Sequence, residues 1–177
     1  MSQAGGRKSI FITGAASGIG AETARYFSKR GWFCGLYDVN TAGLDEVAAE
    51  IGAGNCLQAR LDVRSREDWS AAMRDFSDAT EGAMNVLFNN AGIMHTGDDD
   101  AVATEEEVWD LTMAVNLKGV FLGCKYGIPA IKRAGGGSII NTASFVALMG
   151  AATPQLAYTA SKGGVLALSR ELAVIHA

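Results

Sequence analysis

Short apolar runs rich in β-branched and aromatic residues alternate along this chain with longer segments of helical period. This alternation constrains the fold more than any other feature. Strands are predicted over residues 9–13, 32–37, 56–61, 86–89 and 138–142. Helical segments between successive strands are typical of parallel strands joined by crossover helices. We therefore predict an α/β fold, a doubly wound parallel sheet in three layers with helices on both faces. The strand order expected of such a sheet is 3-2-1-4-5-6, of which these five strands would form 3-2-1-4-5.

Five helices are expected between and after these strands. They cover residues 19–30, 41–51, a segment beginning at residue 65, residues 104 to about 126, and residues 158–176. Ser65 precedes acidic residues and suits an N-cap, and Thr104 with Glu107 has the spacing of a capping box. These start signals set the expected beginnings of the third and fourth helices.

Composition limits the class of protein. With 177 residues and no linker or repeat, a single domain spanning residues 1–177 is expected. The net charge of -4 gives no attraction for nucleic acid or for an anionic membrane, and no apolar stretch is long enough to span a bilayer. The three cysteines are far apart and lie in apolar segments, which favours free thiols in a reducing compartment and so a cytoplasmic protein.

Two acidic runs invite a metal-site interpretation, which we reject. Residues 98–100 are three aspartates, expected in a solvated loop, and residues 105–107 are three glutamates, expected in the first turn of a helix. Neither His95 nor His176 has the spacing of a metal ligand. We expect no metal site.

A glycine-rich loop closes the first predicted strand and opens the first predicted helix. Gly14, Gly18 and Gly20 allow close backbone approach, and with Ser17 and Ile19 they lead into a helix N-terminus whose free N–H groups suit a pyrophosphate. The GxxxGxG spacing differs from the GxGxxG of other dinucleotide-binding folds. The order of strand, loop, helix, strand and acid strengthens the interpretation as a dinucleotide site.

The acid in that order is Asp38, at the end of the second predicted strand and about 20 residues after the loop. A carboxylate there can bind the ribose hydroxyls of NAD and would repel the 2'-phosphate of NADP. Ser17 and Val39 are uncharged, so neither supplies a cation for that phosphate. The cofactor is therefore predicted to be NAD in preference to NADP. The alternative is that Asp38 only caps the following helix.

Tyr158 and Lys162 lie four residues apart, on one face of the last predicted helix. A phenol of pKa about 10 needs about 4 kcal/mol of preferential stabilisation of its phenolate to serve as a base near neutral pH. A cation ~4 to 5 Å away at an effective dielectric of ~20 supplies roughly that amount. Lys162 could therefore make Tyr158 an acid/base group.

Together these motifs resemble the ordered set of the short-chain dehydrogenase/reductase family. The matching segments are the glycine loop of residues 13–20, the sequence Asn-Asn-Ala-Gly at residues 89–92, Asn116, Ser144, and Tyr158 with Lys162. The resemblance runs from about residue 7 to residue 175 and implies a Rossmann fold. It also implies an NAD-dependent enzyme that moves a hydride between NAD and the carbon of a small alcohol or ketone.

The resemblance also implies a role for each matching residue. Tyr158 would be the general acid/base, Lys162 would lower its pKa and hold the nicotinamide ribose, and Ser144 would bind the substrate oxygen. Asn116 would hold a water in a proton relay. Around the cofactor, Asp62 and Val63 would lie beside the adenine, and Asn90, Ala91 and Gly92 would line the cleft. Two alternatives remain: Ser144 ends a strand, and Asn116 braces its helix.

Members of this family usually continue past the helix that carries the tyrosine, into further strands and a substrate loop. The resemblance therefore implies that the last strands are missing and the chain is incomplete at its C-terminus. It also implies a homodimer or homotetramer for the complete subunit. A catalytically silent fragment that binds a dinucleotide or a partner chain is the alternative function, because the substrate region is absent.

Overall fold

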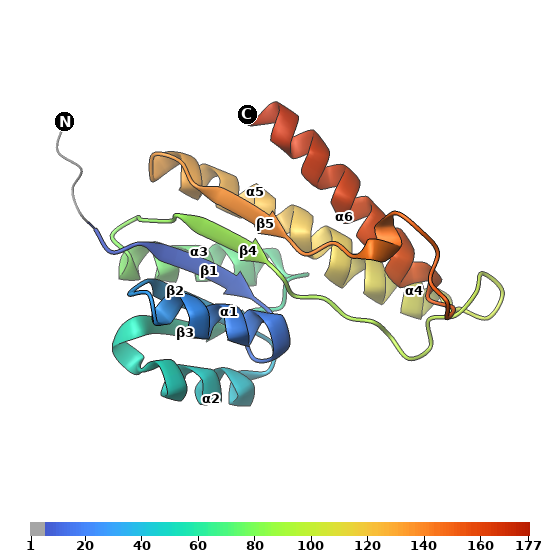
Figure 1. Ribbon diagram of the computed structural model, residues 1–177, viewed down its shortest axis with the longest axis horizontal. Coiled ribbons are helices and arrows are strands. Elements are labelled where there is room, and N and C mark those ends of the chain that lie inside the picture. Colours follow the sequence, from blue (N-terminus) through green and yellow to red (C-terminus); the bar gives the residue numbers. More distant parts are fainter. Residues whose placement is uncertain (1–5) are drawn as a thin grey trace.

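The computed structural model describes residues 6–177, whose core is a five-stranded sheet in the order β3-β2-β1-β4-β5. Every neighbouring pair of strands is parallel (Figure 1). The strands are β1 (Ser9–Thr13), β2 (Phe33–Asp38), β3 (Cys56–Arg60), β4 (Val86–Asn89) and β5 (Ser138–Asn141). The predicted fold class and strand order are confirmed.

Helices follow each strand and return the chain to the start of the next. They are α1 (Gly18–Ser28), α2 (Thr41–Ile51), α3 (Arg66–Ala79), α4 (Glu106–Met113), α5 (Gly119–Arg133) and α6 (Leu156–Ile175). A π-helical segment, Ala114–Lys118, joins α4 to α5. Short 3-10 turns occupy Ala53–Asn55 and Phe145–Ala147.

The two faces of the sheet bury separate cores because alternate side chains of a strand point to opposite sides. Ile10 and Ile12 of β1 pack with α1 and α2, whereas Phe11 packs with α3 and α5. The ring of Phe11 stacks on Tyr37 with a centroid distance of 4.0 Å. Fully burying an aliphatic or aromatic side chain contributes about 1.5–3 kcal/mol, so these layers fix the sheet on which the loops stand.

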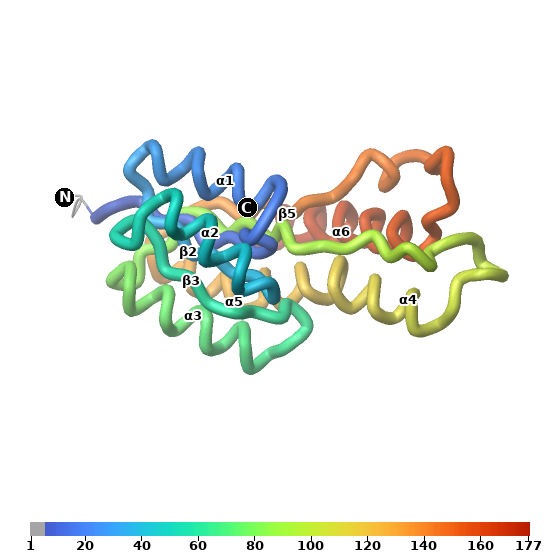
Figure 2. The backbone as a smooth tube through the Cα atoms, turned by 90° about the horizontal axis from the view of Figure 1, so that it is seen from below, coloured from blue at the N-terminus to red at the C-terminus, as the bar shows by residue number. Residues whose placement is uncertain are grey.

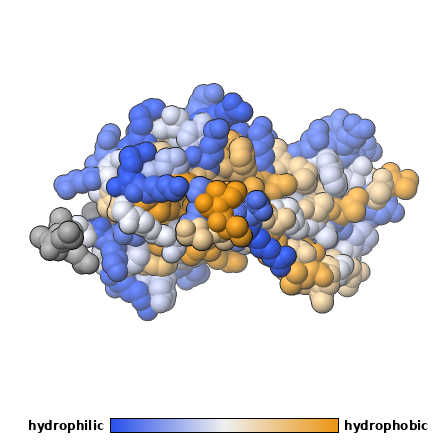
Figure 3. Space-filling model, turned by 90° about the horizontal axis from the view of Figure 1, so that it is seen from above, coloured by the Kyte–Doolittle hydropathy of each residue, from blue (hydrophilic) through white to orange (hydrophobic). Residues whose placement is uncertain are grey.

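A third cluster joins α6 to α5 and to one face of β5. Val165 of α6 packs with Val120 and Cys124 of α5, and Ile139 lies against the same cluster. The next residue of β5, Ile140, points to the other face, where no helix of residues 6–177 covers it, and it is 46% exposed. Apolar surface gathers in the middle of the view from above (Figure 3).

The capping box predicted at Thr104 and Glu107 for the fourth helix is wrong. The helix begins at Glu106, and the hydroxyl of Thr104 instead accepts a hydrogen bond from the N–H of Asp99 at 2.9 Å. Ser65 does cap α3, because its hydroxyl accepts from the N–H of Asp68 at 3.1 Å. A contact within the preceding loop, five residues away, has replaced the expected cap at Thr104.

The expected end of that helix near residue 126 is also wrong. The helical chain continues through Pro129 to Arg133. A proline inside a helix costs about 3 kcal/mol. Packing of α5 against the sheet offsets that cost. Ile131 is buried, and Gly127 lies so close to β4 that a Cβ on it would be 2.4 Å from a methyl carbon of Leu87. The other predicted ends agree with the structure to within two residues.

No helix within residues 6–177 combines the length and the hydropathy needed to cross a membrane.

Candidate active site

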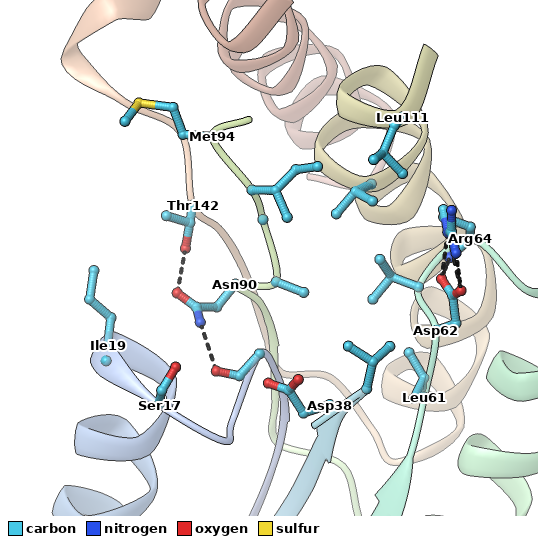
Figure 4. Close-up of a pocket in the computed structure, with 18 of the residues that line it drawn as sticks. Ser17, Ile19, Asp38, Leu61, Asp62, Arg64, Asn90, Met94, Leu111 and Thr142 are labelled. Carbon is cyan, nitrogen blue, oxygen red and sulfur yellow. Dashed lines mark hydrogen bonds and ion pairs between the residues drawn. The ribbon is translucent and has the colours of Figure 1, made fainter. Parts of the chain in front are cut away.

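A cleft of about 610 Å³ opens at the carboxyl ends of the strands, where doubly wound sheets bind ligands (Figure 4). Most of the predicted site residues share its lining. These are Gly14, Ser17, Gly18, Ile19, Asp38, Asp62, Val63, Asn90, Ala91, Gly92, Tyr158 and Lys162. Gly20, Asn116 and Ser144 do not line it.

The glycine loop is built for close backbone approach. Gly14 has a positive φ of 68°, and a Cβ on Gly20 would lie 2.0 Å from the carbonyl oxygen of Gly14. Gly20 does not line the cleft, but its lack of a side chain lets the first turn of α1 pack against the backbone of Gly14. Ser17 makes no capping hydrogen bond with its side chain, and the first turn of α1 has no acidic residue. This open helix N-terminus fits the pyrophosphate of a dinucleotide.

Asp38 lies at the end of β2 with its carboxylate directed at the glycine loop. Oδ2 accepts a hydrogen bond from the N–H of Ala16 at 3.1 Å, and Oδ1 accepts from the N–H of Asn40 at 3.0 Å. The cap of α2 is Asn40, whose side chain accepts from the N–H of Gly43. Helix capping is therefore not what Asp38 does, and its carboxylate remains part of the cleft lining.

Asp62 and Arg64 form an ion pair on the side of the cleft opposite Ser17 and Ile19 (Figure 4), with 2.6 Å between Asp62 Oδ2 and Arg64 Nη2. Hydrogen bonding to the Arg64 guanidinium lowers the pKa of the Asp62 carboxyl. Arg64, which also lines the cleft, was not predicted from the sequence. Because the arginine is held by Asp62, its charge is largely neutralised in the structure.

The segment after β4 is tied to the first strand. The hydroxyl of Thr13 accepts hydrogen bonds from the N–H groups of Asn90 and Ala91, at 3.0 and 3.1 Å. Asn90 Nδ2 donates to the carbonyl oxygens of Thr13 and Gly14. These contacts brace the segment after β4 against the end of β1 and the glycine loop, beside the cleft that it lines.

Asn116 is fully buried in the π-helical segment, behind the cleft wall. Its Oδ1 accepts from the N–H of Ile93 at 2.8 Å, and its Nδ2 donates to the carbonyl oxygen of Ile93 at 2.8 Å and to Ser161 Oγ at 3.1 Å. The side chain thus braces the loop after β4 against α6. The π-helical segment itself had no signal in the sequence, although such segments often occur at functional sites.

Tyr158 and Lys162 lie on the first turns of α6 and both face the cleft. Lys162 Nζ is 5.6 Å from the centre of the Tyr158 ring and donates to the carbonyl oxygen of Thr142 at 2.7 Å. Lys162 is only 3% exposed, and burial lowers its pKa. Within residues 6–177 no carboxylate forms an ion pair with it, so its charge is available to the cleft.

Ser144 begins the 3-10 turn that follows β5. Its hydroxyl oxygen accepts from the N–H of Val146 at 3.4 Å, and the residue is half-buried. Ser144 does not end the strand, as the alternative interpretation has it, because β5 ends at Asn141 and the hydroxyl caps the turn that follows. A substrate contact by Ser144 stays a prediction.

Asp98 contradicts the expectation of a solvated acidic loop. Its side chain is 8% exposed, and its two carboxylate oxygens accept from the N–H groups of Ala157 and Tyr158 at 2.9 and 2.8 Å. Asp99 and Asp100 are exposed, as expected. The three aspartates look alike in the sequence, and only a contact about 60 residues away distinguishes the first. Thr142, the carbonyl partner of Lys162, was missed for the same reason.

Among known proteins, this chain is similar to dehydrogenases and to a reductase. Cyclohexanol dehydrogenase of Acinetobacter sp. (strain SE19) is 37% identical, over 100% of this chain and 70% of its own length. The 2-(R)-hydroxypropyl-CoM dehydrogenase of Xanthobacter autotrophicus is 39% identical, over 94% of this chain and 67% of its own. The crystal structure of levodione reductase superposes with a TM-score of 0.89 at 30% identity, covering 96% of this chain and 66% of that one.

The chain thus spans about two thirds of the length of the relatives that it matches. The family model described as short chain dehydrogenase matches residues 8–177. That match covers nearly the whole chain and all the motifs of the cleft, so this protein belongs to the short-chain dehydrogenase family, whose named members here are dehydrogenases and reductases.

Proposed function

We propose that this chain is the cofactor-binding and catalytic part of an NAD-dependent dehydrogenase that acts on a small secondary alcohol or ketone. The observation that carries the proposal is the pairing of Tyr158 and Lys162 on one face of α6, inside the same cleft that the glycine loop and Asp38 line. A protein that only bound a dinucleotide would not need a buried lysine beside a phenol.

In the proposed reaction Tyr158 moves the proton of the substrate oxygen. During alcohol oxidation its phenolate takes the hydroxyl proton, and during ketone reduction its phenol returns one. Lys162, held by Thr142, places a positive charge beside the phenol and favours the phenolate. The nicotinamide, when bound, supplies the hydride acceptor or donor. Ser144 is proposed to bind the substrate oxygen, and Asn116 to support a proton-relay water.

NAD is proposed in preference to NADP. Asp38 places a carboxylate in the cleft, and the one arginine lining the cleft, Arg64, is already paired with Asp62. The other cation that lines the cleft, Lys162, is held by Thr142 beside Tyr158 on α6. A 2'-phosphate beside Asp38 would therefore meet a negative charge, with Arg64 already neutralised and Lys162 engaged beside Tyr158.

A small alcohol or ketone is proposed as substrate, on the strength of the relatives. Their names include a dehydrogenase of cyclohexanol and a dehydrogenase of D-threitol. We also propose a homo-oligomeric subunit and a cytoplasmic location; free Cys34, Cys56 and Cys124 fit a reducing compartment.

The test is steady-state kinetics of the purified protein with cyclohexanol and D-threitol, each with NAD and with NADP, following formation of the reduced cofactor. Calorimetry measures cofactor binding separately. The proposal expects turnover with at least one alcohol and a larger kcat/KM with NAD. Tight NAD binding without turnover of any secondary alcohol would support a silent binding protein instead.

A further inference from the structure

The carboxylate of Asp98 caps the helix that carries Tyr158, although it belongs to a distant loop. It lies between β4 and α4 and accepts hydrogen bonds from the N–H groups of Ala157 and Tyr158. The carbonyl oxygen of the next residue, Asp99, accepts from the N–H of Leu156 at 3.1 Å. Three successive N–H groups of the first turn of α6 are thus bound by two loop residues. Figure 2 shows this loop running beside α6.

The first turn of α6 has no cap of its own. Its N-cap residue, Gln155, makes no hydrogen bond with its side chain, and the turn contains no acidic residue. Within residues 6–177 no lysine or arginine forms an ion pair with Asp98. The buried carboxylate is therefore balanced by the positive end of α6 and by its two N–H donors.

The same loop is tied to α6 a second time through Asn116. This amide holds both the N–H and the carbonyl oxygen of Ile93, at the start of the loop, and donates to Ser161 Oγ. Ser161 Oγ in turn donates to the carbonyl oxygen of Tyr158 at 2.7 Å. Both backbone polar groups of Tyr158 thus lead to the loop after β4, one through Asp98 and the other through Ser161 and Asn116.

We propose that Asp98 is a positioning residue, which sets the place of the Tyr158 phenol relative to the cleft wall formed by Ile93 and Met94. The inference rests on the proposed function, because it assigns the purpose of the contact to proton transfer by Tyr158. Asp98 does not line the cleft and acts through the backbone N–H groups of Ala157 and Tyr158. A displacement of about 1 Å in a reacting group can cost about 10²-fold in rate, so a small shift of the first turn of α6 would reduce turnover strongly.

The test compares Asp98→Ala, Asp98→Asn and the control Asp99→Ala. Asp99 is a neighbouring aspartate of equal charge, but it is exposed, and within residues 6–177 its side chain hydrogen-bonds only to the N–H of Asp100. In Asp98→Ala, kcat should fall by about 10- to 100-fold while the KM for NAD changes less than about twofold. Asp98→Asn retains one acceptor oxygen and should be intermediate. Asp99→Ala should behave as the wild type.

Amide hydrogen exchange provides a readout independent of activity. The amides of Ala157 and Tyr158 should exchange faster in Asp98→Ala, with no change in β1 or α1, and Asp98→Asn gives the same measurement if the alanine variant folds poorly. Faster exchange throughout the protein, or equal losses of kcat and NAD affinity, would indicate general destabilisation and refute the positioning role. Unchanged kcat in both variants would also refute it. A wild-type protein without turnover refutes the proposed function. Unchanged exchange at Ala157 and Tyr158 in Asp98→Ala refutes the positioning role of Asp98, whatever the activity.

Discussion

Lys162 Nζ donates a 2.7 Å hydrogen bond to the carbonyl oxygen of Thr142, so the buried cation of α6 is fixed to the end of β5. A carbonyl oxygen orients the ammonium group without neutralising it. Its positive charge thus remains directed at the cleft and at Tyr158.

The burial of Lys162 should make the protein more stable as pH rises toward 10.5. Burial lowers the pKa of Lys162 below its usual 10.5, so the folded state binds fewer protons than the unfolded state in the pH range just below 10.5. The free energy of unfolding contributed by Lys162 therefore rises as pH increases through that range, and the cost of the buried charge is full below the folded-state pKa. Relative to Lys162→Met, the wild type should gain stability as pH rises.

Urea unfolding of both proteins at several pH values from neutral to about 10 measures this difference. Lys125→Met, at an exposed lysine of α5, is the control for loss of a lysine. A wild type that loses stability relative to Lys162→Met as pH rises would contradict the account.

Asp38 should determine the choice of cofactor through its charge. Asp38→Asn retains an acceptor for the N–H of Ala16 but removes the repulsion of a 2'-phosphate. The ratio of kcat/KM for NADP to that for NAD should rise by about tenfold or more, equivalent to about 1.4 kcal/mol. Asp45→Asn, an exposed carboxylate on α2, should leave the ratio unchanged. If both substitutions shift the ratio equally, general surface charge rather than Asp38 determines the preference.

Gly20 should tolerate no side chain. A methyl group there would lie 2.0 Å from the carbonyl oxygen of Gly14, so the loop or α1 must move. Gly20→Ala should lower the free energy of unfolding by about 1–3 kcal/mol and weaken NAD binding. Gly163→Ala is the matched control, because an added Cβ would meet no heavy atom within 4 Å beyond its chain neighbours and the backbone of its own helix, and alanine favours a helix by up to about 1 kcal/mol. Thermal melts and calorimetry decide the matter, and a Gly20→Ala protein with unchanged NAD affinity would contradict the packing argument.

Local sequence signals predicted the elements whose side chains are dictated by their own strand or helix. β1 is a run of five buried residues, and the glycine loop after it follows from the need for close backbone approach. Ser65 was predicted to cap α3 because acidic residues follow it, and its hydroxyl does accept from the N–H three residues on. Such short-range contacts are encoded by spacing alone.

Contacts between distant segments could not be predicted in this way. Asp98 was grouped with its exposed neighbours, and the capping box at Thr104 was assigned although its hydroxyl binds Asp99 instead. The helix continues past Pro129 because burial against β4 offsets the local penalty. At Asp98 and Pro129 a tertiary contact outweighed a local preference, whereas at Thr104 the cap lost to another contact only five residues away.

The proposed NAD-dependent oxidation depends above all on proton transfer by Tyr158. The most direct test measures kcat for alcohol oxidation and the Kd for NAD in the wild type and in Tyr158→Phe. Removing the phenolic hydroxyl should reduce kcat by about 10²- to 10⁴-fold, while NAD affinity and thermal stability stay close to those of the wild type. A Tyr158→Phe protein that retains wild-type turnover, or that loses turnover only because it no longer binds NAD, would contradict the account.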